Sequence, residues 1–205
     1  MSIEQDAPAT QDSGRLVALL DAAFGVFMRY GYRKSSMQDI AEAAQISRQG
    51  LYLHFATKEL LFRAVVEHYM LRAQQAAVEA LADADLESGL VNACDAWMGE
   101  FVGLGSTVVS ELHEMGPTLI GPMAAAYDAR FQQLLAARIE ESPLAALLAP
   151  LSLSPTHLAV MLHAAARGHK HTATSREQFR SLIGEAVRMI CAPLLLHTTR
   201  TDLRR

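Results

Sequence analysis

Residues 36–58 have the sequence SMQDIAEAAQISRQGLYLHFATK, and this stretch decides how the N-terminal part of the chain folds. Ser36 is a candidate N-cap, and Asp39 stands three positions later, where its carboxylate can complete a capping box. Ser47 is a candidate N-cap for a second run of residues. The stretch therefore predicts two short helices separated by a tight turn, over about residues 37–43 and 47–54.

The second predicted helix has two different faces. At about 100° per residue, Leu51 and Phe55 fall on one side, which can pack inward. Four residues fall on the opposite side: Arg48, Gln49, Tyr52 and Leu53. Two short helices joined by a tight turn, the second with polar groups facing outward, are the layout of a helix-turn-helix DNA-binding motif.

The polar groups of this motif have the chemistry that DNA requires. Arg48 can form paired hydrogen bonds with guanine, and Gln49 can form them with adenine. Gly50 has no side chain, so a phosphate or a base edge can approach the backbone closely. Four side chains are predicted to contact phosphates: Ser36, Tyr52, His54 and Lys58. The alternative is a small helical hairpin in an all-α core, with Arg48 and Gln49 as ordinary solvated residues.

A longer pattern makes the DNA-binding interpretation more specific. It consists of Gly31-Tyr32, Ser36, Asp39-Ile40-Ala41, Ile46-Ser47 and Leu51-Tyr52-x-His54-Phe55-x-x-Lys58. The pattern resembles the N-terminal DNA-binding region of TetR-type (tetracycline-repressor-like) transcription regulators over roughly residues 15–65, about a quarter of the chain. The remainder is similar to this family only in length, helical content and helix order.

Gln45 departs from the family pattern, which has glycine between the two helices. A left-handed backbone at this position costs a residue other than glycine about 1 kcal/mol. The sequence therefore predicts either a positive φ at Gln45 or a slightly altered turn.

The composition favours an all-α chain with a locally positive N-terminal part. Hydrophobic residues make up 51% of the 205 residues, and strand-type alternation is hard to find. The net charge is −4, but residues 29–63 have a local net charge of +3, so the remainder has −7. This distribution fits contact with DNA at one limited site rather than coating of DNA.

The sequence predicts three parts: a flexible tail over residues 1–14, a helix-turn-helix DNA-binding domain over 15–60, and an effector-binding and dimerisation domain over 61–200. The first helix is expected to run from Arg15 to Tyr30 and to stop at Gly31. A long helix from Thr57 to about Leu81 then joins both domains as a rigid lever. Further helices are expected over about residues 87–103, 105–114, 118–141, 155–171 and 176–197.

Several classes of protein and site are not indicated. The N-terminus has no basic start followed by an apolar run, and no apolar stretch is long enough to span a membrane, so we expect a cytoplasmic protein. Cys94 and Cys191 are expected to be reduced core thiols, with a redox pair as the alternative. The eight histidines include no metal-binding motif, and the sequence predicts neither a metal site nor a cofactor.

The last two long helices are the candidates for a homodimer interface. Their apolar residues are Leu158, Met161, Leu162 and Ala165 in residues 156–171, and Phe179, Leu182, Ile183, Ala186, Val187 and Ile190 in residues 176–197. Two such hairpins can form a four-helix bundle, and the family resemblance implies the same dimer with two DNA half-sites in an inverted repeat. The alternative is that both helices close the core of one subunit.

The middle of the chain has residues suited to a small-molecule site. Candidate pocket residues are Tyr69, Trp97, Phe101, His113, Met123, Tyr127 and Met161. Large aromatic side chains with scattered polar groups are typical of small-molecule sites, although such stripes are more often plain core. The resemblance implies an effector pocket here.

These observations predict an all-α, homodimeric transcriptional regulator that is not an enzyme. The resemblance implies a repressor that a small apolar or amphipathic effector releases from its operator. One alternative is a helical small-molecule-binding or catalytic protein with a structural N-terminal hairpin. Another is a DNA-binding structural protein without an effector.

Overall fold

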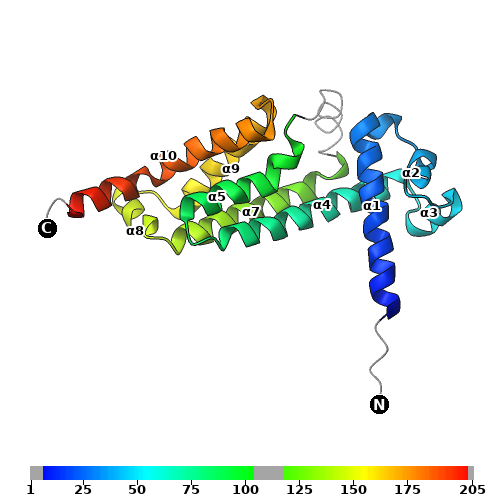
Figure 1. The fold of residues 1–205 in the computed structure, drawn as a ribbon, viewed down its shortest axis with the longest axis horizontal. Coiled ribbons are helices and arrows are strands. Elements are labelled where there is room, and N and C mark those ends of the chain that lie inside the picture. Colours follow the sequence, from blue (N-terminus) through cyan, green and yellow to red (C-terminus); the bar gives the residue numbers. More distant parts are fainter. Residues whose placement is uncertain (1–6, 104–117, 203–205) are drawn as a thin grey trace, which may run out of the picture. The chain divides into compact units, whose positions relative to one another are not determined.

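The computed structural model describes residues 7–103 and 118–202, with the side chains of residues 14–103 and 118–192. Every regular element in these ranges is a helix (Figure 1), which confirms the all-α class. The chain folds into two compact units. The first contains the described residues up to Tyr69 together with residues 118–123, and the second contains residues 70–103 and the described residues from Ala124 onward.

The first unit contains α1 (Ala7–Lys34), α2 (Met37–Ala43), α3 (Arg48–His54) and the beginning of α4 (Lys58–Leu81). Its core is built by one apolar face from each helix: Leu19, Leu20, Ala23, Val26 and Phe27 of α1, Met37, Ile40 and Ala41 of α2, Leu51 of α3, and Leu61, Phe62 and Val65 of α4. Aromatic contacts stabilise this core: the Phe62 ring lies edge-on to Phe27 and to Tyr32, with centroids 5.1 Å and 4.9 Å apart.

Helix α1 differs from the predicted first helix at both ends. It begins at Ala7 rather than Arg15, so residues 7–14 of the predicted tail are helical. Pro8 lies in the first turn, where a helix tolerates proline because that N–H has no intrahelical partner. Gly31 interrupts the helix at φ 79°, as the predicted stop requires, and a short helical piece follows it to Lys34.

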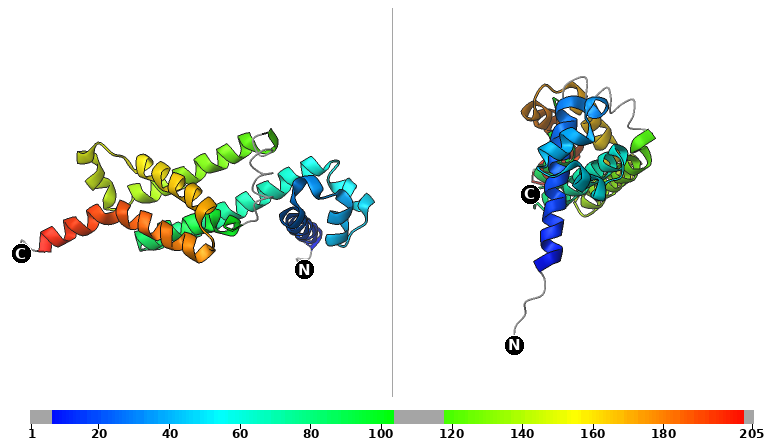
Figure 2. Two further views of the ribbon diagram at one scale, coloured as in Figure 1. Left: turned by 90° about the horizontal axis from the view of Figure 1, so that it is seen from above. Right: turned by 90° about the vertical axis from the view of Figure 1, so that its right-hand side faces the viewer.

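The second unit contains the rest of α4 with α5 (Leu86–Met98), the 3-10 helix η1 (Gly99–Phe101), α7 (Gly121–Glu140), α8 (Leu144–Leu148), the 3-10 helix η2 (Ala149–Leu151), α9 (Pro155–Thr172) and α10 (Arg176–Asp202). Helix α10 packs against α5, α8 and α9 (Figures 1 and 2). The largest fully buried side chains here include Phe131, Leu162, Phe179 and Ile183. The helix predicted over residues 105–114 lies outside the described residues.

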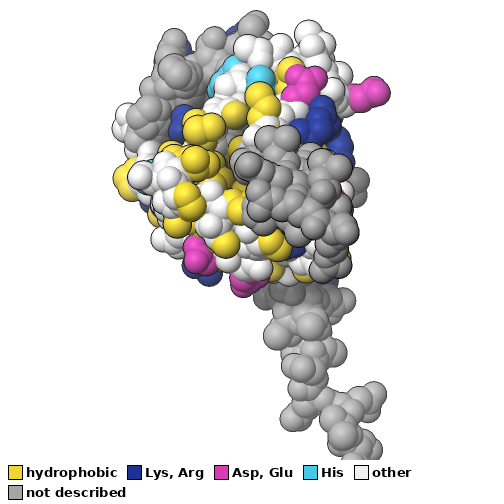
Figure 3. All heavy atoms as spheres, turned by 90° about the vertical axis from the view of Figure 1, so that its left-hand side faces the viewer, with side chains coloured by type: hydrophobic (Ala, Val, Ile, Leu, Met, Phe, Trp, Pro, Cys, Tyr) yellow, Lys and Arg dark blue, Asp and Glu magenta, His cyan; other side chains and the backbone are white. Residues whose placement is uncertain are grey.

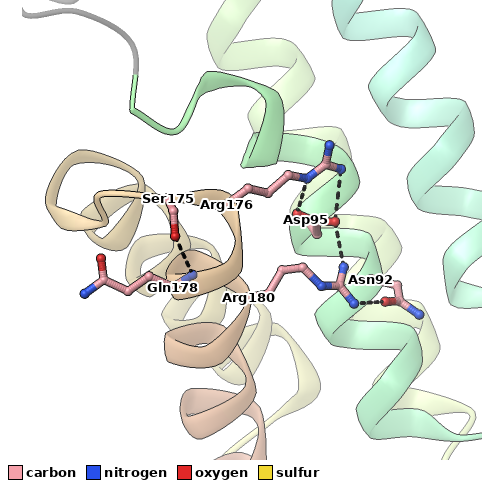
Figure 4. A network of polar contacts seen from close by, with 6 residues as sticks. All are labelled: Asn92, Asp95, Ser175, Arg176, Gln178 and Arg180. Atoms are coloured by element: carbon pink, nitrogen blue, oxygen red, sulfur yellow. Dashed lines mark hydrogen bonds and ion pairs between the residues drawn. The ribbon is translucent and has the colours of Figure 1, made fainter.

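Helix ends in the second unit follow local sequence signals. Ser154 caps α9, with Pro155 in the first turn and His157 as the reciprocal member of a capping box. At the start of α10, the Gln178 backbone N–H donates to Ser175 Oγ at 3.1 Å (Figure 4). The side chain of Gln178 instead accepts from Thr174, so only half of a capping box forms around Ser175.

One ionic network ties α10 to α5. The carboxylate of Asp95, with a side chain only 10% exposed, accepts from Arg176 at 2.8 and 3.0 Å and from Arg180 at 2.6 Å (Figure 4). Arg180 also donates to Asn92 Oδ1 at 2.8 Å. Burial tends to raise the pKa of Asp95, but the hydrogen bonds from Arg176 and Arg180 outweigh it and lower the pKa below its ordinary value.

Candidate nucleic-acid interface

The entry into α2 is fixed by the predicted capping box. The Asp39 N–H donates to Ser36 Oγ at 3.2 Å, and the Ser36 N–H donates to Asp39 Oδ2 at 2.8 Å. The Ser36 hydroxyl also donates to Asp39 Oδ2 at 2.7 Å, and this bond, followed by that from the Ser36 N–H, lowers the pKa of Asp39. The hydroxyl of Ser36 is therefore engaged within the protein, and its predicted contact with a phosphate would have to be made through an already bonded group.

The turn between α2 and α3 is a Schellman motif. Gln45 has φ 56°, which confirms the predicted positive φ. The Ile46 N–H donates to the Ala41 carbonyl at 3.0 Å, and the Gln45 N–H donates to the Glu42 carbonyl at 3.1 Å. The turn keeps the left-handed backbone conformation that glycine usually adopts at this position. Here Gln45 adopts it, at the cost of backbone strain.

Helix α3 starts at a second predicted cap. The Gly50 N–H donates to Ser47 Oγ at 2.9 Å. A Cβ at Gly50 would lie 3.1 Å from the same Ser47 oxygen, tighter than an ordinary contact. Gly50 therefore leaves room for the cap of its own helix, in addition to the close approach of DNA that the sequence suggests.

The two faces of α3 are those that the sequence predicts. Leu51 is fully buried, whereas Arg48, Gln49 and His54 are exposed, Tyr52 is 41% exposed and Leu53 is 84% exposed. The Arg48 guanidinium lies over the Tyr52 ring, 5.6 Å from its centroid. This cation–π contact restricts the arginine to the outward face before any ligand binds.

Lys58, at the first position of α4, joins that helix to the end of α1. Its Nζ donates to the Tyr32 carbonyl at 2.7 Å and to the Ser35 carbonyl at 2.8 Å, and it lies 4.5 Å from the centroid of the Tyr32 ring. Carbonyls at a helix C-terminus have no intrahelical partner, so a lysine stabilises them. Thr57 Oγ1 accepts from the Leu60 N–H at 3.2 Å, so Thr57 caps this helix.

The candidate pocket residues are distributed over both units. Tyr69 and Met123 belong to the first unit, and Tyr69 stacks on Phe24 at 3.8 Å between centroids and donates to Asp21 at 3.1 Å. In the second unit, Trp97 is buried and stacks on Phe131 at 4.7 Å, while Tyr127 packs against the same core. Phe101 is half-buried, Met161 is 62% exposed, and His113 lies outside the described residues.

A polar network beside Trp97 was not predicted from the sequence. His163, only 3% exposed, has Nδ1 2.8 Å from Gln132 Nε2 and Nε2 3.2 Å from Asp128 Oδ1. Burial tends to raise the pKa of Asp128, but its hydrogen bond and charge interaction with His163, together with Arg167 and Trp97, lower it overall. His163 is thus held between Gln132 and Asp128, and its ring lies edge-on to Phe131, which stacks on Trp97.

Helices α9 and α10 pack most of their predicted interface residues inward but also expose apolar side chains. Leu158, Leu162, Phe179, Ile183, Val187 and Ile190 of the predicted interface are buried in the core of the second unit. Val160 is 45% exposed, Met161 62% and Met189 72%. Figure 3, viewed from the side on which α8 and the C-terminal part of α10 lie, shows hydrophobic side chains gathered at the surface.

The cysteines, possible metal ligands and apolar helices of the described residues indicate no further site. Cys94 and Cys191 are both buried free thiols, and burial raises the pKa of Cys94 to about 12 and that of Cys191 to about 11, so neither is a reactive thiolate near neutral pH. Within the described residues, no group of three or more His, Cys, Asp or Glu side chains is placed to hold a metal ion. In the same part of the chain no single helix has the length and apolarity needed to cross a membrane, and only the pair of residues 144–151 and 155–172, bent by 99°, meets these criteria together.

Comparison with known proteins gives matches over both the N-terminal domain and the whole fold. Residues 19–65 match the family model described as bacterial regulatory proteins, tetR family. The chain is 42% identical over 55 residues to the HTH-type transcriptional repressor ComR of Escherichia coli, which covers 27% of this chain and 26% of that repressor. The chain thus matches about a quarter of the length of this relative.

Solved structures resemble more than four fifths of the chain. A TetR-like transcriptional regulator from Rhodococcus sp. RHA1 has a TM-score of 0.60 at 25% identity, covering 86% of this chain and 96% of that one. A cysteine mutant of the TetR family regulator CifR, complexed with 26-base-pair operator DNA, has a TM-score of 0.61 at 21% identity, covering 83% of this chain and 94% of that one.

Proposed function

This chain belongs to the TetR family of bacterial regulatory proteins, and we propose that it is a homodimeric transcriptional repressor whose release from an operator is controlled by a small apolar or amphipathic effector. The observation that carries the DNA-binding part is the frame of α2 and α3. Both helices are capped, Gln45 closes the turn, and buried Leu51 fixes the rotation of α3. This frame holds Arg48, Gln49 and Tyr52 outward.

We assign the contacts by chemistry. Arg48 and Gln49 contact base edges, and Gly50 permits close approach of the backbone. Phosphates are held by Tyr52 and His54 on the exposed side of α3, and by Ser36 and Lys58 at the starts of α2 and α4. An acidic body with a locally positive motif restricts binding to this face.

The proposed dimer explains how so small a motif can recognise an operator. A seven-residue helix contacts few bases, so two copies are needed, with half-sites about one DNA turn apart or a multiple of that distance. Val160 and Met161 of α9 and Met189 of α10 are exposed apolar side chains that suit a four-helix bundle with a second copy. An operator of this kind is an inverted repeat. Because a bacterial operator lies in the cytoplasm, the proposed function implies a cytoplasmic protein.

The effector site is proposed in the second unit. Trp97 and Tyr127 of the core of this unit, with half-buried Phe101, supply apolar surface, and the network of Asp128 and His163 supplies polar groups. An effector that prefers one arrangement of this unit would shift α4, and with it the spacing of the two α3 helices in the dimer.

The test is selection of bound sequences from a random duplex pool, followed by titration of the selected duplex at two salt concentrations. We expect an inverted repeat and a steep loss of affinity with salt. Arg48→Ala should cost about 1–3 kcal/mol of binding free energy and relax the preference at one base position. Tyr52→Phe is the variant matched to Arg48→Ala: it keeps the aromatic ring under Arg48 and removes only the hydroxyl assigned to a phosphate.

The effector is sought with the selected duplex in hand. A thermal-shift screen of diverse apolar compounds, followed by displacement of the duplex, should yield compounds that raise Tm and release DNA. No enrichment of any sequence by the folded protein would refute the DNA-binding function and favour a helical ligand-binding or catalytic protein. A flat compound screen with intact DNA binding would refute only the effector.

A further inference from the structure

Leu53 is the outward residue of α3 that has no role in the assigned contacts. Its side chain is 84% exposed, more than Met189 at 72% or Met161 at 62%. Buried Leu51 already anchors α3 to the core of the first unit, and Leu53 does not belong to that core. An exposed leucine is ordinary on a protein surface, but this one lies on the face that carries Arg48 and Gln49.

The side chains of α3 form two adjacent columns. Arg48 and Tyr52 form one, joined by their cation–π contact, and Gln49 and Leu53 form the other, because residues four apart are neighbours on a helix. One helical turn rises about 5.4 Å, and successive base pairs lie about 3.4 Å apart. Leu53 is therefore displaced from Gln49 by one to two base steps along a groove that α3 follows.

The major groove has a single kind of apolar group at its base edges, the C5-methyl group of thymine. A leucine forms no hydrogen bond with a base or a phosphate, and it gains free energy only by burying apolar surface. Since the proposed function places this face of α3 in the major groove, we propose that Leu53 is a specificity-determining residue that recognises a thymine methyl in each half-site, one or two base steps from the base that Gln49 contacts.

The test uses the duplex selected by the wild-type protein and replaces thymine by uracil, one position at a time and symmetrically in both half-sites. Uracil keeps the hydrogen bonds of thymine and lacks only the methyl group. Loss of one buried methyl group should weaken binding about fourfold per half-site, and about 16-fold when both half-sites are changed. Leu53→Ala should bind the thymine duplex more weakly and should not discriminate between thymine and uracil.

Two variants separate recognition from general effects. Leu53→Met retains an apolar side chain of similar reach and should keep most of the discrimination. Leu71→Ala removes a 51% exposed leucine of α4 and should leave discrimination unchanged. Because Leu53 is so exposed, Leu53→Ala should unfold like the wild type, so a changed affinity reports on DNA contact.

The outcomes are distinct from those that test DNA binding itself. Specific binding that is insensitive to uracil at every thymine, or a selected half-site without thymine in this region, would overturn the role of Leu53 and leave the DNA-binding function intact. Equal discrimination by Leu53→Ala and the wild type would overturn it too. Absence of specific binding by the wild type would overturn both.

Discussion

Gln45 is a single side chain whose backbone conformation conflicts with its chemistry. At φ 56° it occupies the left-handed region, which costs L-residues about 1–2 kcal/mol relative to glycine. Glycine loses more chain entropy on folding, which offsets part of this gain. We expect Gln45→Gly to raise the free energy of unfolding by about 0.5–1 kcal/mol, measured by urea denaturation.

Two substitutions control this prediction. Gln45→Ala keeps the strain and should stay within about 0.5 kcal/mol of the wild type. Ser152→Gly, at the other residue with φ 56° in the described part of the chain, should also stabilise. A destabilised Gln45→Gly would mean that the glutamine side chain stabilises the turn by more than its backbone strain costs.

Lys58 acts at the junction of two helix ends. Its ammonium group holds the Tyr32 and Ser35 carbonyls, and hydrogen bonds to charged groups contribute about 1.5–3 kcal/mol, less where solvent reaches them. Lys58→Met keeps the aliphatic stem and removes these bonds. We expect it to lower the free energy of unfolding by about 1–2 kcal/mol and, through loss of a phosphate contact, to flatten the log–log salt dependence of DNA binding by about one unit.

The two effects of Lys58→Met are measured separately. Urea denaturation of the free protein reports the helix junction, and titration of the selected duplex at several salt concentrations reports the phosphate. Loss of stability with an unchanged salt slope would restrict Lys58 to positioning α4 against α1. Unchanged stability would show that the contacts with the Tyr32 and Ser35 carbonyls contribute nothing to folding.

The ionic network between α5 and α10 should make stability depend on pH. The pKa of Asp95 is lower in the folded protein than its ordinary value of 3.8. Its contribution is therefore complete above about pH 4 and is lost as the pH falls through the lower, folded-state pKa. We expect Asp95→Asn to cost about 1–2 kcal/mol at pH 7, since both arginines are half-exposed, and the difference from wild type to shrink below pH 4.

Gly99 offers an independent way to break the same network. A Cβ there would overlap the Asp95 carboxylate and lie 2.9 Å from Arg176 Nε. Gly99→Ala should therefore destabilise the protein and weaken the same acid dependence. Gly25→Ala, where the Cβ meets nothing within 4 Å, should instead stabilise α1 by about 0.5–1 kcal/mol. A pH-independent deficit in Asp95→Asn would show that the network does not couple protonation to folding.

Helix boundaries and caps show which features a sequence can predict. The capping box of Ser36 and Asp39, the cap at Ser47 and the positive φ of Gln45 depend on residues within four positions of one another. Such local signals predict the fold of the motif and the outward face of α3. The early start of α1 at Ala7 was missed because Gly14 and the polar residues around it resemble a tail.

Contacts between distant parts of the chain could not be predicted. Lys58 meets the Tyr32 carbonyl 26 positions away, His163 meets Asp128 at 35 positions, and Arg176 meets Asp95 at 81 positions. Each pairing depends on how helices pack, which periodicity does not determine. The same reason explains why the stacking of Trp97 on Phe131, 34 positions away, could not be predicted.

In the proposed function, operator recognition depends on the assembly of two chains. Met161 of α9 is 62% exposed and Met189 of α10 is 72% exposed, so neither supports the core of its own subunit. An arginine at either position would leave the free energy of unfolding of the monomer nearly unchanged, but it would place charge in an apolar interface between two copies. We expect Met161→Arg and Met189→Arg to convert dimers into monomers in sedimentation velocity.

Loss of the dimer should lower the affinity for operator DNA although no residue of α3 is changed. A monomer contacts one half-site, and loss of the linked second contact should reduce operator affinity on the order of 100-fold. Leu71→Arg changes a 51% exposed leucine of α4 and should remain dimeric with wild-type affinity. If both methionine variants remain dimers, the interface lies on another surface. If the wild type is a monomer that still binds an inverted repeat, DNA rather than the helices of the second unit brings the two copies together.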